Sequence, residues 1–246
     1  MPYQWRWEVF LEPVPGGGST YLGWLAAGLA TTVALSLAAW LVALAVGSVM
    51  GVLRTVPSRA LRAVGAGYVE LFRNVPLLVQ LFLWYFVVPE VVPAGLGAWM
   101  KGLHPFAQQF LAAAACLSLF TGARICEQVR AGIGSLAGGQ RAAALALGFR
   151  LPQAYRHVLL PMAFRIVLPP LTSELLNVFK NSAVASTIGL LELAAQGRQL
   201  VDYTAQPYES FIAVTLLYVL LNLAALAGMR AIEARTRVPG FIGAGR

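Results

Sequence analysis

The feature that most constrains this chain is an uncharged run from Tyr21 to Leu53, which contains no Asp, Glu, Lys, Arg or His. A helix of about 20 predominantly apolar residues crosses the roughly 30 Å hydrocarbon core of a bilayer, so this run can span it with tilt. The whole chain is also 59% hydrophobic and only 11% charged, whereas soluble domains carry about 25% charged residues. Lipid must therefore cover much of the surface, and we expect an all-α, polytopic integral membrane helical bundle.

Four further segments are long and apolar enough to cross a bilayer, which makes five predicted spans. The fourth span is the least apolar, because it carries Glu174 and Lys180. The five predicted spans are residues 21–53, 71–88, 106–123, 171–191 and 211–229. Two shorter segments, 95–102 and 194–203, are compatible with short helices, but their sequences do not decide this.

The basic residues are distributed unevenly between alternate loops. Thirteen of the 18 Lys and Arg residues follow the first, third and fifth spans, whereas the N-terminus, the second loop and the fourth loop hold only Arg6, Lys101 and Arg198. Cytoplasmic segments retain an excess of Lys and Arg, so we expect the N-terminus outside and the C-terminus in the cytoplasm. Residues 1–20 would then form a periplasmic segment, 21–230 the transmembrane domain and 231–246 a cytoplasmic tail.

The cytoplasmic segment 124–165 is too long and too regular for a simple linker. Residues 140–147 are rich in Ala and Leu, which favour helix, and Gly148 follows where a left-handed C-cap residue is needed. Pro152 suits the first turn of a second helix, which we expect Pro161 to end. Two interpretations fit this helix–turn–helix: an amphipathic hairpin lying on anionic lipid, or a docking surface for a cytoplasmic partner. The small side chains of the first helix favour docking mildly.

Ionisable groups near or inside the second span are candidates for function, because lipid makes them costly. Glu70 and Arg73 lie three residues apart and can pair on a helix. Pro76 leaves a backbone carbonyl unpaired, and Gln80 lies one turn further along. A structural ion pair at the cytoplasmic rim is the simpler interpretation of this group.

The fourth span carries a second polar set. Glu174, Asn177 and Asn181 recur at helical spacing, with Lys180 and Ser182 beside them. Such a face must meet protein or water rather than lipid. It can hold the bundle together by hydrogen bonds between helices, or it can line a solute path, and these two roles are compatible.

Three segments resemble a known family, the permease subunits of binding-protein-dependent ABC importers. Residues 139–171 (GQRAAALALGFRLPQAYRHVLLPMAFRIVLPPL) are similar to the EAA loop of the polar amino-acid branch. Residues 68–82 (YVELFRNVPLLVQLF) and 173–190 (SELLNVFKNSAVASTIGL) resemble the same branch in the same order. Their sequences are similar to those of permeases from glutamate/aspartate importers. The resemblance covers nearly all of the chain except the first 20 residues.

The resemblance implies that segment 124–165 is a coupling element that inserts into a cleft of a separate ATPase subunit. The family's usual glutamate falls on Ala142 here, so any ion pair that it makes to the ATPase cannot form. The residues expected to contact the ATPase are Gln140, Arg141, Ala142, Ala143, Leu147, Gly148 and Pro161.

The resemblance also implies partners and a location. The expected partners are ABC ATPase subunits, a second permease that is identical or homologous, and an extracytoplasmic substrate-binding protein. The expected location is the bacterial inner membrane. If the solute is an acidic amino acid, Lys180 is the candidate counter-charge for a carboxylate, and Glu174 is a candidate for its amino group.

Several chemistries are missing from the sequence. No G-x-x-x-x-G-K-[ST] phosphate loop occurs, so we expect ATP and Mg²⁺ on the partner and no cofactor on this chain. The two cysteines, Cys116 and Cys126, lack metal-ligand spacing, and we expect unpaired thiols and no metal site. The net charge of +8 lies in loops rather than on one basic face, so no nucleic-acid partner is expected. The alternative functions are a secondary transporter and a membrane scaffold that docks a cytosolic partner without transport.

Overall fold

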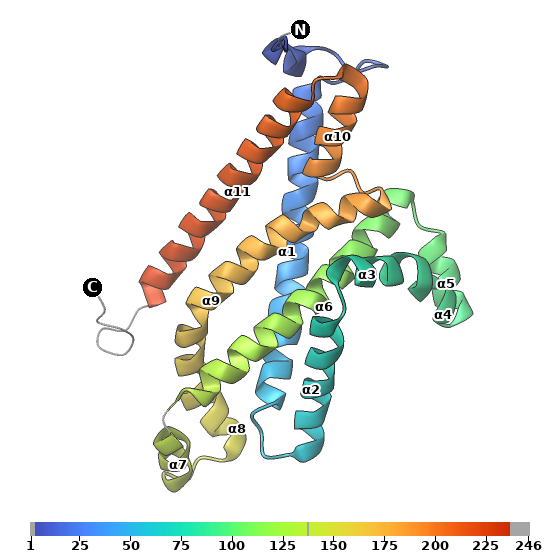
Figure 1. Cartoon of the computed structure of the whole chain (residues 1–246). Coiled ribbons are helices and arrows are strands. Elements are labelled where there is room, and N and C mark those ends of the chain that lie inside the picture. Colours follow the sequence, from blue (N-terminus) through green and yellow to red (C-terminus); the bar gives the residue numbers. More distant parts are fainter. Residues whose placement is uncertain (1–2, 137, 237–246) are drawn as a thin grey trace. The chain divides into compact units, whose positions relative to one another are not determined.

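A computed structural model describes residues 3–136 and 138–236, which are helical over most of their length (Figure 1). Within these residues there is one isolated β-bridge, Pro13 with Thr20, and no extended strand. The helices are η1 (Trp7–Leu11), α1 (Tyr21–Leu53), α2 (Arg59–Asn74), α3 (Leu77–Phe82), η2 (Leu83–Val87), α4 (Val88–Val91), α5 (Ala94–Lys101), α6 (Pro105–Gly134), α7 (Gly138–Ala146), α8 (Leu151–Ala154), η3 (Tyr155–Leu159), α9 (Leu160–Asn181), η4 (Ser182–Ile188), α10 (Leu193–Thr204) and α11 (Pro207–Thr236). The predicted all-α fold is confirmed, and the two short segments are helices α5 and α10.

Four of the described helices are long and apolar enough to cross a membrane by themselves. They are Tyr21–Leu53, Pro105–Gly134, Leu151–Ile188 and Pro207–Thr236. The pair Arg59–Asn74 and Leu77–Val91 meets the same test only when taken together. Five spans therefore result if this broken pair counts as one.

The prediction of one continuous second span over residues 71–88 is wrong. Helix α2 ends at Asn74, and Val75 is extended with φ −99° and ψ 129° before Pro76. Proline disfavours the helical region for the residue that precedes it, so Val75 leaves the helix. A new helix, α3, begins at Leu77.

The prediction that Pro161 ends a helix is also wrong, because α9 runs through Pro161, Pro169 and Pro170 to Asn181. A proline lacks the N–H that a helix needs and clashes with the carbonyl four residues earlier. Here the π-helical turn η3 precedes Pro161, and the Leu160 N–H bonds five residues back to the Tyr155 carbonyl. This single wide turn shifts the hydrogen-bond register, and the helix continues.

The predicted loop 124–165 is therefore mostly helical. Helix α6 extends to Gly134, and the segment from Leu151 onward joins α9 without a break. The true connection between these two long helices is residues 135–150, which contain α7. Helix α9 begins at Leu160 and the continuous helical run at Leu151, so the fourth predicted span begins at least three turns before the expected residue 171.

The chain forms two compact units. Unit 1 contains Met1–Ala39, Pro76–Leu117 and Asn177–Ala224, and unit 2 contains Trp40–Val75, Ser118–Leu176 and Ala225–Arg246. The chain passes from one unit to the other five times, so its two ends belong to different units. The segments predicted to lie outside the cell belong to unit 1, and those predicted to be cytoplasmic belong to unit 2.

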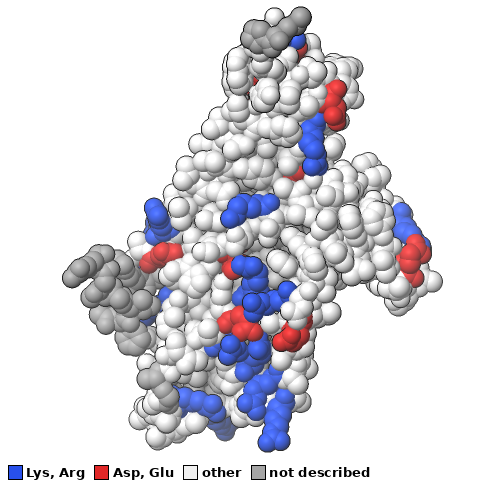
Figure 2. All heavy atoms as spheres, viewed as in Figure 1, with Lys and Arg blue, Asp and Glu red and all other residues white. Residues whose placement is uncertain are grey.

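The charges follow the two units. Unit 2 carries 12 of the 16 Lys and Arg residues in the described part of the chain. Figure 2 shows basic side chains gathered over the face where the helices of unit 2 lie. Unit 2 therefore contains the segments that the Lys and Arg counts predict to be cytoplasmic.

The core of unit 1 joins the N-terminal segment to α1, α10 and α11. Its buried side chains are Val9, Val14, Tyr21, Leu25, Leu193, Leu200 and Val214. Two glycines allow close approach: a Cβ on Gly28 would lie 2.7 Å from Gln196 Cγ, and one on Gly197 would lie 2.4 Å from Val214 Cγ2. Small residues at such contacts are typical of helix packing in membranes.

The core of unit 2 is built around α6. Ala43 of α1, Ile125 of α6 and Val167 and Leu171 of α9 form one buried cluster. A second cluster joins the end of α6 to the hairpin through Ile133, Leu136, Tyr155, Leu159 and Ala163. Helix α6 is thus the element on which the other helices of this unit pack.

Candidate coupling surface and substrate path

The first helix of the hairpin, α7, ends as the sequence predicts. Gly148 has a positive φ of 85°. The Gly148 N–H bonds the Leu145 carbonyl at 3.0 Å, and the Phe149 N–H bonds the Ala144 carbonyl at 3.1 Å. This pair of bonds is a Schellman motif, which needs a left-handed residue that glycine adopts without strain. The turn therefore fixes the direction in which the chain leaves α7.

Helix α7 presents a largely apolar surface. Ala144 is buried at 3%, whereas Leu145 is 42% and Leu147 80% exposed. Ala142 and Ala143 are exposed, while Gln140 and Arg141 are half-buried. These exposed alanines and leucines make a surface with few polar groups for a partner to desolvate.

The second arm of the hairpin is anchored to the rest of unit 2. The Gln153 side chain accepts a hydrogen bond from the Arg150 N–H at 2.8 Å and begins the helix. The hydroxyls of Tyr155 and Thr55 are 3.0 Å apart. Pro161, a predicted contact residue, is exposed on α9 rather than at the end of the hairpin. The anchored arm continues into α9, and residues 147–150 link it to the exposed α7.

The predicted Glu70–Arg73 pair does not form. The Glu70 carboxylate instead accepts a hydrogen bond from Asn74 Nδ2 at 2.9 Å. No Glu70–Arg73 ion pair within 4.0 Å occurs in residues 3–136 and 138–236. Gln80 is buried in unit 1, at 4% exposure. The residues that the sequence grouped at one rim are therefore divided by the break at Pro76.

Glu174 is held by two side chains of α6. Its carboxylate accepts from Arg124 Nε at 2.7 Å and from Gln128 Nε2 at 2.9 Å. The Glu174 side chain is 5% exposed, whereas that of Arg124 is 43% exposed. A nearby opposite charge compensates a buried carboxylate for lost hydration. This geometry matches the alternative role of span four, which is holding helices together.

A second carboxylate on α6 was missed by the sequence interpretation. Glu127 pairs with Arg54, which follows α1, and with Arg130 Nη2 at 3.0 Å. The acid and its distant partner are 73 residues apart in the chain. Only the packing of α1 against α6 reveals this contact.

The remaining predicted path residues lie near the end of α9. Lys180 is exposed in its last turn, and no carboxylate of the described residues lies within 4.0 Å of it. Ser182 is buried and donates to the Phe179 carbonyl at 2.7 Å. Asn177 and Asn181 are half-buried. Lys180 is therefore the member of this group that is charged and accessible.

The cavity beside Asn181 is too small for an amino acid. Asn181 lines it together with Leu77, Cys116 and Ala185, and its volume is about 10 Å³. Ligand pockets are usually about 300–1,000 Å³. This cavity by itself therefore does not form a substrate site.

Glu192 is a structurally central residue that the sequence interpretation did not single out. It is 0% exposed and is the N-cap of α10, accepting from the N–H groups of Ala194 at 3.0 Å and Ala195 at 2.8 Å. It also accepts from the hydroxyl of Tyr218 at 2.8 Å. Glutamate is not among the favoured N-cap residues, so propensity gives no signal for this role.

The sequence predictions also concern the cysteines and the possible metal ligands of the described residues. Cys116 and Cys126 are buried and free, as predicted. Within the described residues, no three His, Cys, Asp or Glu side chains are grouped as a metal site would require.

Four or five apolar spans, with an exposed helical hairpin continuous with one of them, define a polytopic membrane subunit. This chain belongs to the family described as binding-protein-dependent transport system inner membrane component, whose profile matches residues 43–238. It is a multi-pass inner-membrane protein and a transport subunit, as the resemblance implied.

Two relatives illustrate the range of similarity. The chain is 54% identical to the glutamate/aspartate import permease protein GltJ of Escherichia coli (strain K12), over 99% of both chains. It is 33% identical to the probable glutamine ABC transporter permease protein GlnM of Bacillus subtilis (strain 168), over 77% of this chain and 82% of that protein.

Solved structures share the fold. A crystal structure of an amino acid ABC transporter with histidines is 28% identical, with a TM-score of 0.73, covering 87% of this chain and 95% of that chain. A MetNI methionine ABC transporter in an inward-facing conformation has a TM-score of 0.71 at 22% identity, covering 87% and 97%. The second likeness concerns the fold alone.

Proposed function

We propose that this chain is the permease subunit of an ATP-driven importer of polar amino acids, with glutamate and aspartate as substrates. The observation that carries the proposal is the 54% identity over 99% of both chains to a glutamate/aspartate import permease. The family match covers the helices from the last third of α1 to the end of α11. The proposal extends the relative's substrate class to this chain.

The proposal includes the partners that such an importer needs. A separate ABC ATPase would bind ATP and Mg²⁺ and receive α7 in a cleft. A second permease, identical or homologous, would complete the path, and an extracytoplasmic binding protein would deliver the substrate. The exposed Leu147 at 80% supports the docking role, because such a residue is typical of a surface that a partner covers.

An acidic substrate needs a positive counter-charge within the path. Lys180 supports this role, since it is exposed and without a described carboxylate partner. Glu174 is already neutralised by Arg124 at 2.7 Å, so we assign it to positioning α9 rather than to the substrate amino group. Asn177 and Asn181, half-buried on the same helix, would line the path beside Lys180.

The test of the function uses the complex as it exists in the membrane. Affinity purification of the tagged chain should recover an ABC ATPase, whose hydrolysis rises when the binding protein and glutamate or aspartate are added. In proteoliposomes, uptake of labelled glutamate should require ATP. Uptake driven by an ion gradient without an ATPase would instead establish a secondary transporter, and a complex without any uptake would establish a scaffold.

The role of Lys180 is tested by charge removal and charge retention. Lys180→Ala should raise the KM for glutamate by roughly tenfold or more, since a hydrogen bond to a charged group is worth about 1.5–3 kcal/mol. Lys180→Arg should retain most uptake. Arg198→Ala, which removes an exposed charge from α10 of the same unit, is the matched control. Unchanged uptake kinetics in Lys180→Ala would refute the assignment.

A further inference from the structure

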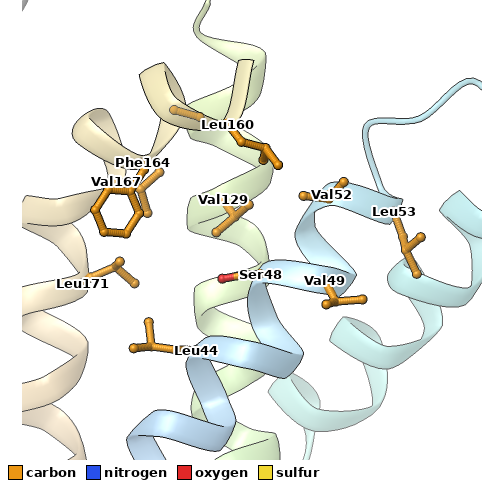
Figure 3. A pocket seen from close by; sticks show the side chains of 11 residues that line it. Leu44, Ser48, Val49, Val52, Leu53, Val129, Leu160, Phe164, Val167 and Leu171 are labelled. Atoms are coloured by element: carbon orange, nitrogen blue, oxygen red, sulfur yellow. The ribbon is translucent and has the colours of Figure 1, made fainter. Parts of the chain in front are cut away.

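A deep apolar groove lies within unit 2 between α1, α6 and α9 (Figure 3). Its volume is about 440 Å³, which is within the usual range of ligand sites. Eleven residues line it, and Ser48 is the only one with a polar side chain. Figure 3 shows Leu44 and Leu171 toward one end and Leu160 and Val52 toward the other. The groove can therefore receive a long apolar group but offers little to a polar one.

The groove exists because α1 and α9 each pack closely on α6. A Cβ on Gly51 of α1 would lie 2.7 Å from Val129 Cβ of α6, and a Cβ on Gly132 of α6 would lie 2.3 Å from Val167 Cγ2 of α9. Both close approaches are made to the same side of α6, and Val129 lines the groove between them. Helix α6 thus forms the floor, while α1 and α9 form the two walls.

The groove is open to the medium around the helices. Val49 on one wall is 57% exposed, and Phe164 on the other is 52% exposed. The walls belong to helices that pass the test for membrane spans, and the chain belongs to an inner-membrane family. Where such spans cross a bilayer, the medium beside the groove is lipid hydrocarbon, and the apolar lining offers water no hydrogen bonds.

A positive charge lies just past one end of the groove. Arg156 precedes Leu160 by four residues across the π-helical turn η3, in which four residues make slightly less than one turn, so it lies about one turn beyond Leu160 on roughly the same side of the helix. It is exposed, and no carboxylate of the described residues lies within 4.0 Å of it. The hydroxyl pair of Thr55 and Tyr155 at 3.0 Å belongs to the same end. The apolar groove thus ends at polar and positively charged groups.

We propose that this groove binds one acyl chain of an anionic phospholipid whose phosphate pairs with Arg156. A lipid of this kind places its chain among apolar side chains and its charge at the basic end, which is the distribution that the site offers. Basic pockets between membrane helices on the cytoplasmic side are suited to anionic headgroups. The inference rests on membrane embedding and not on the transported substrate.

The experiment measures lipid bound to the purified transporter complex. The complex is exchanged into nanodiscs containing equal amounts of phosphatidylglycerol and phosphatidylcholine, extracted, and analysed by native mass spectrometry. Wild type should retain one phosphatidylglycerol per copy of this chain. Val49→Trp fills the groove and should abolish retention, whereas Val219→Trp, on α11 and 48% exposed, is the control outside the groove.

The headgroup is tested by a pair of arginine variants. Arg156→Gln should lower the preference for phosphatidylglycerol about fivefold, because one arginine near an anionic headgroup contributes about 1 kcal/mol. Arg165→Gln should leave the preference unchanged, since successive helix residues are rotated by about 100° and Arg165 points away from the lining face. Gel filtration confirms that each variant remains assembled.

Three results would overturn the proposal. If wild type retains no lipid, the groove does not bind a phospholipid acyl chain. If it retains both lipids equally, Arg156 does not select an anionic headgroup. Cross-linking of Cys at Val49 to a second permease subunit would show that protein covers the groove. Each outcome leaves the transport activity to be judged by its own assay.

Discussion

At the level of single residues, each of the two units is stabilised internally by a buried carboxylate. In unit 1, Glu192 accepts hydrogen bonds from the start of α10 and from Tyr218 of α11. In unit 2, Glu174 joins α9 to α6 through Arg124. A buried donor that loses its acceptor costs free energy that a surface group does not, so these residues should dominate stability.

Glu192→Ala is expected to lower the free energy of unfolding by about 2–4 kcal/mol, because it removes an N-cap and leaves buried donors unpaired. Thermal unfolding of the detergent-solubilised protein measures the effect. Glu90→Ala is the matched control, since the Glu90 side chain is 63% exposed and pairs with Lys101 at the surface. Such exposed pairs contribute about 0–1 kcal/mol. Equal losses in the two variants would contradict the central role of Glu192.

Tyr3 provides a pH-dependent contact between the N-terminal segment and α11. Desolvation and its hydrogen bond to the Glu209 carboxylate raise the pKa of Tyr3 to about 12. Because the folded-state pKa is above the ordinary value of 10.0, this contact stabilises the protein fully below pH 10 and is lost as pH rises toward 12. Wild type should therefore unfold at a higher temperature than Tyr3→Phe at pH 8, and the difference should shrink above pH 10. A difference that grows with pH would contradict the assignment.

At the level of elements, the segment that contains α7 and α8 is a helical hairpin rather than an irregular loop. Its second arm continues through the π-helical turn η3 into α9. A displacement of α7 by a partner would therefore reach the membrane helix directly. The same device recurs at η2, where the Val88 N–H bonds the Leu83 carbonyl just before Pro89.

Ala143→Trp tests whether docking of α7 depends on shape. Ala143 is exposed, so the larger side chain should not disturb the fold but should obstruct a close-fitting cleft. We expect ATP-driven uptake to fall by about tenfold or more, the effect of losing about 1.4 kcal/mol of binding, while ATP hydrolysis persists. Arg141→Ala should have the smaller effect, because no glutamate stands at position 142 to form a polar network with the ATPase. The opposite ranking, measured in proteoliposomes, would show that polar contacts decide docking.

At the level of the whole molecule, the division into two units gives the predicted orientation a direct test. Unit 2 carries most of the positive charge, so Ser19 of unit 1 should face outside and Leu147 of unit 2 the cytoplasm. Cys116 and Cys126 are buried and can be replaced by Ser. In intact cells that express this chain without the ATPase, an impermeant thiol reagent should label Ser19→Cys but not Leu147→Cys, and both should react after the membrane is opened. Labelling of Leu147→Cys alone in intact cells would show that the orientation in the membrane is the reverse of the predicted one.

The sequence by itself determined that lipid surrounds much of the chain, that the fold is all-α, and that basic residues alternate between successive loops. An uncharged run such as Tyr21–Leu53 leaves few alternatives in lipid, because every backbone group must be bonded internally. Local chemistry also determined the turn at Gly148, since a left-handed C-cap depends on a few adjacent residues. These features need no information about distant parts of the chain.

Only the tertiary structure decided which polar groups meet and where helices end. Glu174 pairs with Arg124, which is 50 residues away, and helix packing rather than local spacing brings them together. Pro76 breaks a helix while Pro161 does not, because a π-helical turn precedes Pro161 and absorbs its missing hydrogen bond. The apolar groove likewise depends on how α1 and α9 pack against α6. Local propensity is short-range, whereas these outcomes depend on contacts between segments far apart in sequence.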